Sequence, residues 1–276
     1  MNIKRRKSYR VVALVIVTTC LIVGAGAWYY LNSQPKTTQQ PVAKKTTEEP
    51  EKPKAVTIKL PNTAEIPALK QDYAKDSSLW RVVGKKYPLD DAHYVPEGLT
   101  LATVASRTDK SQLERSMRSD IMPEIEKLFN AAKAEGYDLM IGSCYRSYEQ
   151  QNIYFSNYSR LYCQAEAETF SAHPGESEHQ TGLSMDIAYV DRHCYIDQCF
   201  ADTPAGKWLA ENAFKYGFIL RYPKGEQTDF IFEPWHYRYV GVDLAGALHS
   251  SGLTLDEAKP YLDAALVELH LPNSIK

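Results

Sequence analysis

The chain has 276 residues, and its 32 Lys and Arg against 34 Asp and Glu give a formal net charge of −2 at pH 7. This balance excludes the strongly basic class of nucleic-acid-binding proteins, so we expect no nucleic-acid partner. Apolar residues make up 44% of the chain, which suits one sizeable folded domain with extensions.

The N-terminal residues have the pattern of a membrane anchor. Basic side chains gather within residues 1–10, and an uncharged apolar run follows at 11–31. A membrane-spanning helix needs about 20 such residues, and basic residues keep their end in the cytoplasm. We therefore predict a single-pass cell-membrane protein whose later residues are extracellular. The alternative is a signal peptide cut after Ala25, Gly26 and Ala27, which would make the protein secreted.

A polar segment separates this predicted anchor from the rest of the chain. Residues 32–58 are rich in Pro, Thr, Lys, Glu and Gln and contain few large apolar groups. Such a segment buries too little surface to offset the entropy lost on ordering, so it serves as a tether. We predict a linker over 32–76 and a folded domain over 77–276.

The first part of the predicted domain contains a helix, a strand and a second helix. Apolar side chains recur at helical spacing from Leu113 to Ala132 and stop before Gly136, which predicts one long amphipathic helix. The segment 138–143 has the pattern of a short strand. Ser147 begins an S-x-x-Q capping box, which predicts that another helix begins there.

The second part predicts a helix from Thr203 to Gly217, paired strands over 218–222 and 230–240, and helices from 241 to 269. The strands lie between helices without a regular βαβ alternation. This order favours the α+β class, with a small, mainly antiparallel sheet flanked by helices.

Four cysteines follow the predicted anchor, in a compartment where disulfides can persist: Cys144, Cys163, Cys194 and Cys199. Four cysteines allow three pairings. The short separation of Cys194 and Cys199 favours a local disulfide between them, which leaves Cys144 to pair with Cys163. The alternative is that the thiols are free.

Three residues are candidate metal ligands: His179, Asp186 and His236. Imidazole and carboxylate are zinc ligands, and a catalytic zinc site uses three of them and leaves one position for water. Glu233 lies three residues before His236, so a bend in the chain would bring both side chains to one site. There the carboxylate would take a proton from the attacking water. The alternative is that these are ordinary polar residues with hydrogen-bonding roles.

Three blocks together resemble the signature of a known enzyme family. They are 143-SCYRSYEQQ-151, 177-SEHQTGLSMD-186 and 233-EPWHYRYVG-241. In this order they are similar to the zinc D-alanyl-D-alanine carboxypeptidases of the VanY-like family, which also includes L,D-carboxypeptidases. The resemblance implies one Zn²⁺ bound by His179, Asp186 and His236, with Glu233 as the general base.

The resemblance also implies roles for three further residues. Arg146 matches the family arginine that stabilises the oxyanion of the scissile carbonyl, a task that suits its planar and permanently charged guanidinium. Gln151 and Ser177 match positions that contact the substrate. Two positions depart from the family pattern, since Cys144 replaces a common Gly and Ser184 a common Ala.

The predicted anchor gives a membrane-tethered protein, and the resemblance implies a zinc D,D-carboxypeptidase that removes the C-terminal D-Ala from peptidoglycan stem peptides; we expect it to be a monomer. Two alternatives stay open. One is an L,D-carboxypeptidase that trims the tetrapeptide to a tripeptide. The other is a non-catalytic cell-wall-binding domain on the same fold, because a fold does not imply a function.

Overall fold

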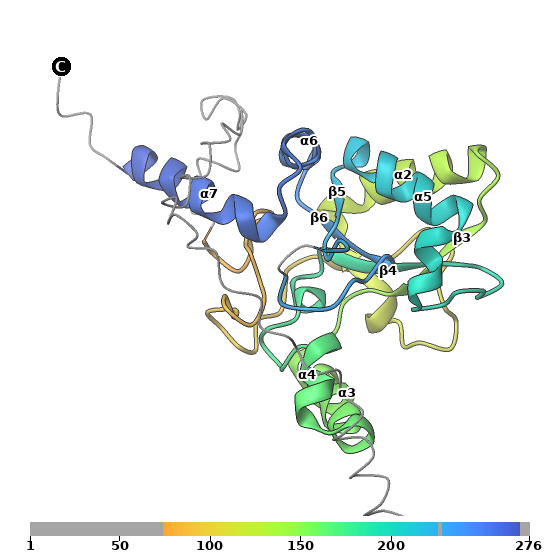
Figure 1. The fold of residues 1–276 in the computed structure, drawn as a ribbon, viewed down its shortest axis with the longest axis horizontal. Helices are drawn as coiled ribbons and strands as arrows, with labels where there is room; N and C mark the ends of the chain where they lie inside the picture. The colour runs from red at the N-terminus through yellow and green to blue at the C-terminus, as the bar shows by residue number, and fades with distance from the viewer. Residues whose placement is uncertain (1–73, 226–227, 271–276) are drawn as a thin grey trace, which may run out of the picture. The chain divides into compact units, whose positions relative to one another are not determined.

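The computed structural model describes residues 74–225 and 228–270 (Figure 1). The predicted anchor at 11–31 lies outside these residues, as does the predicted linker up to residue 73. Both therefore stay predictions. Among the helices that the structure describes, none is long and apolar enough to cross a membrane.

The described chain contains short strands and helices, with short 3-10 helices between some of them. In chain order the main elements are β1 (Leu99–Leu101), β2 (Ser116–Arg118), α2 (Met122–Ala134), β3 (Leu139–Ser143), α3 (Tyr148–Tyr162), α4 (Gln164–Phe170), β4 (Ser184–Tyr189), α5 (Pro204–Asn212), β5 (Phe218–Leu220), β6 (His236–Tyr239), α6 (Val242–Ser251) and α7 (Leu255–His270). The 3-10 helices are η2 (Leu113–Arg115), η3 (Ser119–Ile121), η4 (Glu178–Thr181), η5 (Gln198–Asp202) and η6 (Ala213–Tyr216).

An antiparallel sheet with the strand order β3-β4-β6-β5 forms the frame of the fold. β1 and β2 form a separate antiparallel pair. The predicted α+β class with a small, mainly antiparallel sheet is confirmed. Side chains alternate across β4, so Met185 and Ile187 pack in the main core while Ser184 and Asp186 face the opposite side. This opposite side carries the candidate site.

Two apolar clusters hold the strands in place. α2 and α5 pack on the core face of the sheet, where Ile125 and Leu209 belong to the same cluster as Met185 (Figure 1). The second cluster joins Trp80 to α6 and α7, and the indole of Trp80 donates to the carbonyl of Val240 at 2.9 Å. α2 and α5 therefore cover the core face of the sheet, whereas α6 and α7 pack with Trp80 in a separate cluster.

The predicted helix over 113–132 is wrong in its first half. Residues 113–121 form η2, β2 and η3, and the α-helix begins only at Met122. The reason is Pro123, which has no N–H to donate and whose ring would clash with a preceding helical turn, so it lies in the first turn of α2. Met117 is nevertheless fully buried. Ile121 is also buried, but Leu113 is 49% exposed, so the helical spacing indicated burial for only part of this segment and gave the wrong secondary structure.

Several other predicted elements are confirmed. The strand over 138–143 corresponds to β3, and the hydroxyl of Ser147 accepts a hydrogen bond from the N–H of Gln150 at 3.2 Å where α3 begins. α5 begins after Thr203, and the helical turns of η6 end at Gly217. The predicted C-terminal helices correspond to α6 and α7.

The predicted strand over 230–240 is shorter than expected. β6 contains only His236–Tyr239, which pairs antiparallel with β5 as predicted. Pro234 cannot donate a ladder hydrogen bond. The chain instead turns here, and the N–H of His236 donates to the carbonyl of Glu233 at 3.1 Å. This turn is the bend that the spacing of Glu233 and His236 requires.

The two predicted disulfides have different outcomes. Cys194 and Cys199 are bonded, which confirms the local disulfide. The predicted pairing of Cys144 with Cys163 is wrong, because both are free thiols. Cys144 is buried in the core just before α3, whereas Cys163 is exposed at its far end. A helix of 15 residues is roughly 22 Å long, far more than a disulfide can span.

Candidate metal centre and active site

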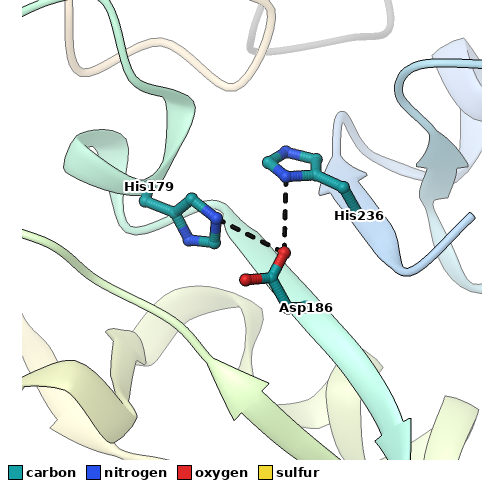
Figure 2. Close-up of side chains that lie close together, drawn as sticks. All are labelled: His179, Asp186 and His236. Atoms are coloured by element: carbon teal, nitrogen blue, oxygen red, sulfur yellow. Dashed lines mark ion pairs between the residues drawn. The ribbon is translucent and has the colours of Figure 1, made fainter. Parts of the chain in front are cut away.

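Three elements bring the candidate metal ligands together (Figure 2). His179 lies in η4, Asp186 in β4, and His236 begins β6 as the cross-strand partner of Asp186. One carboxylate oxygen of Asp186 lies 3.5 Å from Nε2 of His179 and 3.5 Å from Nδ1 of His236. All three side chains are buried, and their candidate ligand atoms lie within 4.8 Å of one another. The structure thus gathers residues from separate sequence blocks into one site.

A sharp turn explains how His179 reaches Asp186. Gly182 ends η4 with a φ of 68°, in the left-handed region that favours glycine. A Cβ atom added there would lie 3.1 Å from Pro96 and 3.2 Å from Leu99. The chain then enters β4 directly. The turn therefore places His179 over the polar side of the strand that carries Asp186.

Hydrogen bonds select which nitrogen of each histidine is available to a metal. Nδ1 of His179 lies 2.6 Å from the carbonyl oxygen of Cys144. Because a carbonyl only accepts, Nδ1 carries the hydrogen and Nε2 keeps its lone pair. In His236 the arrangement is reversed, since Nε2 lies 3.3 Å from a carboxylate oxygen of Glu178 and Nδ1 faces Asp186. The two nitrogens that keep a lone pair, Nε2 of His179 and Nδ1 of His236, therefore both face the same oxygen of Asp186.

This donor set fits zinc. Two imidazole nitrogens and one carboxylate oxygen form the three-ligand set that a catalytic zinc ion accepts. Burial alone would raise the pKa of Asp186, but the neighbouring imidazoles of His179 and His236 hold it well below its usual range. Asp186 is therefore anionic, as a metal ligand must be.

Glu233 provides a second carboxylate beside the ligand cluster. One of its oxygens lies 3.6 Å from Nδ1 of His236, at the start of the turn described above. Burial raises the pKa of Glu233 to about 8, against the opposing effect of His236. A carboxylate with a pKa near neutrality can take up and release a proton during a reaction.

Arg146 contributes its positively charged guanidinium group to the lining of the same cavity. Its guanidinium donates to Oε1 of Gln151 at 2.9 Å and to the hydroxyl of Ser143 at 3.2 Å, and it lies over the ring of Tyr154. Its Nε is buried and has no hydrogen-bond partner among the described residues. This unsatisfied donor indicates that Arg146 can accept an anionic ligand.

A cavity of about 430 Å³ joins these groups, and Gln151 and Ser177 line it together with the metal-ligand candidates. Gln151 is only 1% exposed, and its amide group is already engaged. Its oxygen accepts from Arg146, and its nitrogen donates to the carbonyl of Ala172 at 2.7 Å. This geometry supports a role in orienting Arg146 in addition to the predicted substrate contact.

The sequence analysis did not single out Glu178, which lies between Ser177 and His179. Its buried carboxylate accepts from Nε of Arg221 at 2.7 Å and from Nη1 of Arg238 at 2.8 Å. Burial alone would raise the pKa of Glu178, but these two guanidinium groups hold it well below its usual range. The available signal was the presence of arginines in strand segments that otherwise read as core, because buried charges are normally paired.

Comparison with known proteins identifies the family. Residues 114–242, which contain all three sequence blocks, match the family described as VanY, D-alanyl-D-alanine carboxypeptidase. YodJ of Bacillus subtilis (strain 168), a carboxypeptidase by name, is 35% identical over 270 residues, which cover 92% of this chain and 96% of YodJ. The chain belongs to the VanY family. The resemblance predicted from the sequence blocks is thereby confirmed.

Solved structures of VanY-family enzymes share the fold. The LdcB LD-carboxypeptidase is 38% identical with a TM-score of 0.63, and the match covers 67% of this chain and 87% of LdcB. A mutant of the vancomycin-resistance D,D-pentapeptidase VanY, solved in complex with Zn(II), is 32% identical with a TM-score of 0.54. That match covers 66% of this chain and 98% of VanY.

Proposed function

We propose that this protein is a zinc-dependent D,D-carboxypeptidase that removes the C-terminal D-Ala from peptidoglycan stem peptides. The observation that carries the proposal is the meeting of His179, Asp186 and His236 with Glu233 and Arg146 around one cavity. Each of these residues matches a position in the three VanY blocks. The Zn(II) complex of the related VanY supports the choice of metal.

The metal would be held by Nε2 of His179, Nδ1 of His236 and the Asp186 carboxylate. A bound zinc ion supplies a Lewis acid that polarises a carbonyl group and lowers the pKa of water. Glu233 accepts the proton of the attacking water and later gives it to the leaving amine of D-Ala. Arg146 stabilises the negative charge that develops on the carbonyl oxygen during the attack.

A second candidate is L,D-carboxypeptidase activity on the tetrapeptide. It is favoured by the likeness to LdcB, which has the higher identity and TM-score of the two solved structures compared above. The two activities use the same chemistry and differ in the residue that precedes the scissile bond. The polar groups assigned above therefore serve both reactions.

The test is to incubate the purified full-length protein with a pentapeptide ending in D-Ala-D-Ala and with a tetrapeptide ending in D-Ala. Released D-Ala is measured with and without a chelator. We expect release from the pentapeptide that stops with the chelator and returns with added Zn²⁺. Release from the tetrapeptide alone would assign the L,D activity. Absence of release from both substrates in the presence of zinc would instead support a non-catalytic wall-binding protein.

We also propose that residues 11–31 anchor the protein and that the following linker lets the domain reach the surrounding cell wall. The proposal is supported by the basic residues before the apolar run. Cell fractionation tests it, because an anchored protein stays in the membrane pellet after a high-salt wash. Recovery of a shortened chain from the culture medium would show a cleaved signal peptide.

A further inference from the structure

We propose that Glu178 is a positioning residue that fixes the tautomer of His236, and that Arg221 links the Glu178 carboxylate to helix α7. The inference rests on the metal site of the proposed function. It assigns a role to a residue that has none in that reaction. The observations that support it are the hydrogen bonds of the buried Glu178 carboxylate.

Among the described residues, the hydrogen-bond partners of the Glu178 carboxylate are two arginines, a serine hydroxyl and a histidine ring nitrogen. One oxygen accepts from Arg221 at 2.7 Å and from Arg238 at 2.8 Å. The other accepts from the hydroxyl of Ser184 at 3.2 Å and faces Nε2 of His236 at 3.3 Å. Because the carboxylate cannot donate, Nε2 must carry the hydrogen. Nδ1 of His236 then keeps the lone pair that faces the ligand cluster.

The register of the sheet creates this arrangement. β4 and β6 pair Ser184 with Arg238 and Asp186 with His236. Residues two apart in a strand share a face, so Arg238 and His236 point to the same side of β6. η4 crosses this side and inserts Glu178 among them. The carboxylate therefore contacts both strands that carry metal-ligand candidates.

Arg221 connects this carboxylate to the C-terminal helix. While its Nε donates to Glu178, its two terminal nitrogens bond both carboxylate oxygens of Asp256 in α7, one of them at 3.2 Å. Arg221 is 1% exposed, whereas the side chain of Asp256 is 19% exposed. A change at Asp256 can therefore reach His236 through Arg221 and Glu178.

The substitution Glu178→Gln tests the tautomer argument because it keeps the shape of the side chain. Its new NH₂ group must face either the two arginines or His236, and both sides present donors. If the NH₂ group faces Arg221 and Arg238, its N–H donors lie against their N–H donors and the hydrogen bonds are lost. Facing His236, it requires Nε2 to accept, which moves the ring hydrogen to Nδ1 and blocks the ligand atom. Either outcome weakens the metal site.

The matched control is Asp76→Asn, another isosteric change at a buried carboxylate that accepts from an arginine. Asp76 bonds Arg81 at 3.2 Å and the backbone N–H groups of Asp90 and Asp91. It therefore reproduces the loss of a buried charge and of an arginine contact without touching a ligand candidate.

The experiment measures zinc affinity of the full-length variants by competition with a chromophoric chelator, and the visible spectrum of the Co²⁺-loaded proteins. We expect Glu178→Gln to bind zinc at least about tenfold more weakly and to change the Co²⁺ spectrum, as loss of a group that orients a metal-bound histidine does. Asp76→Asn should match the wild type in both measurements. Wild-type affinity and spectrum in folded Glu178→Gln would overturn the proposal, as would an equal loss in Asp76→Asn.

Asp256→Asn tests the link to α7, and it also carries the test if Glu178→Gln fails to fold. We expect a smaller loss of zinc affinity, of a few fold. Where both changes fold, the double variant should bind zinc no more weakly than Glu178→Gln, because both act along one chain of contacts. An unchanged affinity in Asp256→Asn would refute the link. Zinc binding is measured without a peptide, so an absence of D-Ala release would reject the proposed function and leave this inference standing.

Discussion

The two walls of the cavity are built differently. On the sheet wall, Asp186, Glu233 and His236 are buried and held by strand pairing, a tight turn and polar contacts. On the helical wall, formed by Tyr158, Tyr162 and Phe170 of α3 and α4, edge-to-face ring contacts hold side chains that are partly or largely exposed. The sheet wall carries the groups that must be oriented for chemistry, and the helical wall offers an adaptable apolar surface.

Glu233 tests the sheet wall with the largest expected effect. We expect Glu233→Ala to lower kcat by about 10²- to 10⁴-fold, the range of a general acid–base group, while zinc remains bound. Steady-state release of D-Ala and metal analysis of the same sample measure both quantities. Loss of zinc together with activity would mean that Glu233 is a ligand instead of the base.

Tyr158 tests the helical wall. We expect Tyr158→Ala to raise KM several fold with little change in kcat, because its ring lines the cavity and has no assigned part in the chemistry. Leu161 is the matched control, since it lies on the same helix, is 75% exposed and is not part of the cavity lining. Leu161→Ala should leave KM unchanged. A large fall in kcat for Tyr158→Ala would contradict the division between the two walls.

The Cys194–Cys199 disulfide should have a smaller effect, on binding and on stability. It closes a short loop whose Ile196 lines the cavity. Replacing both cysteines by Ser should destabilise the fold by about 2 kcal/mol, as expected for a loop of this length, and raise KM slightly. Thermal unfolding and kinetics of the double variant measure these changes. Unaltered values in both would show that the loop keeps its shape without the bond.

The smallest effect concerns how α3 is attached. Burial alone would raise the pKa of Glu114, but hydrogen bonds from Tyr154 of α3 and from Lys110 lower it to about 2, from an ordinary value of 4.5. Because the folded-state pKa is depressed, this stabilisation is complete above about pH 4.5 and is lost as the pH falls towards 2. Glu114→Gln should therefore reduce the pH dependence of the unfolding temperature in that range. An identical pH profile in the variant would refute the assignment.

The sequence predicted the site better than it predicted the details of the fold. The three blocks contain the residues that the structure brings together, because the chemistry of a metal site restricts residue type strongly. The helix over 113–121 was mispredicted because buried apolar residues can recur every three or four positions without a helix. Pro123, which was visible in the sequence, marked where the helix could begin.

The hydrogen-bond partners of Glu178 and Gln151 could not be predicted because they depend on contacts across the fold. Glu178 meets Arg221 and Arg238, which are 43 and 60 residues away in the chain. Gln151 lies five residues after Arg146 in the sequence, yet its hydrogen bond to Ala172 depends on how α4 ends. The failure of the predicted Cys144–Cys163 pairing has a similar cause, because the length of α3, which separates the two thiols, depends on where that helix ends.

The cross-strand pairing of Asp186 with His236 has a consequence for assembly of the protein. If β4 and β6 paired one residue out of register, one of these side chains would turn to the opposite face of the sheet. A metal ion that needs both ligands would therefore bind only when the two strands are correctly aligned. The ion would favour the native strand alignment in addition to its part in the reaction.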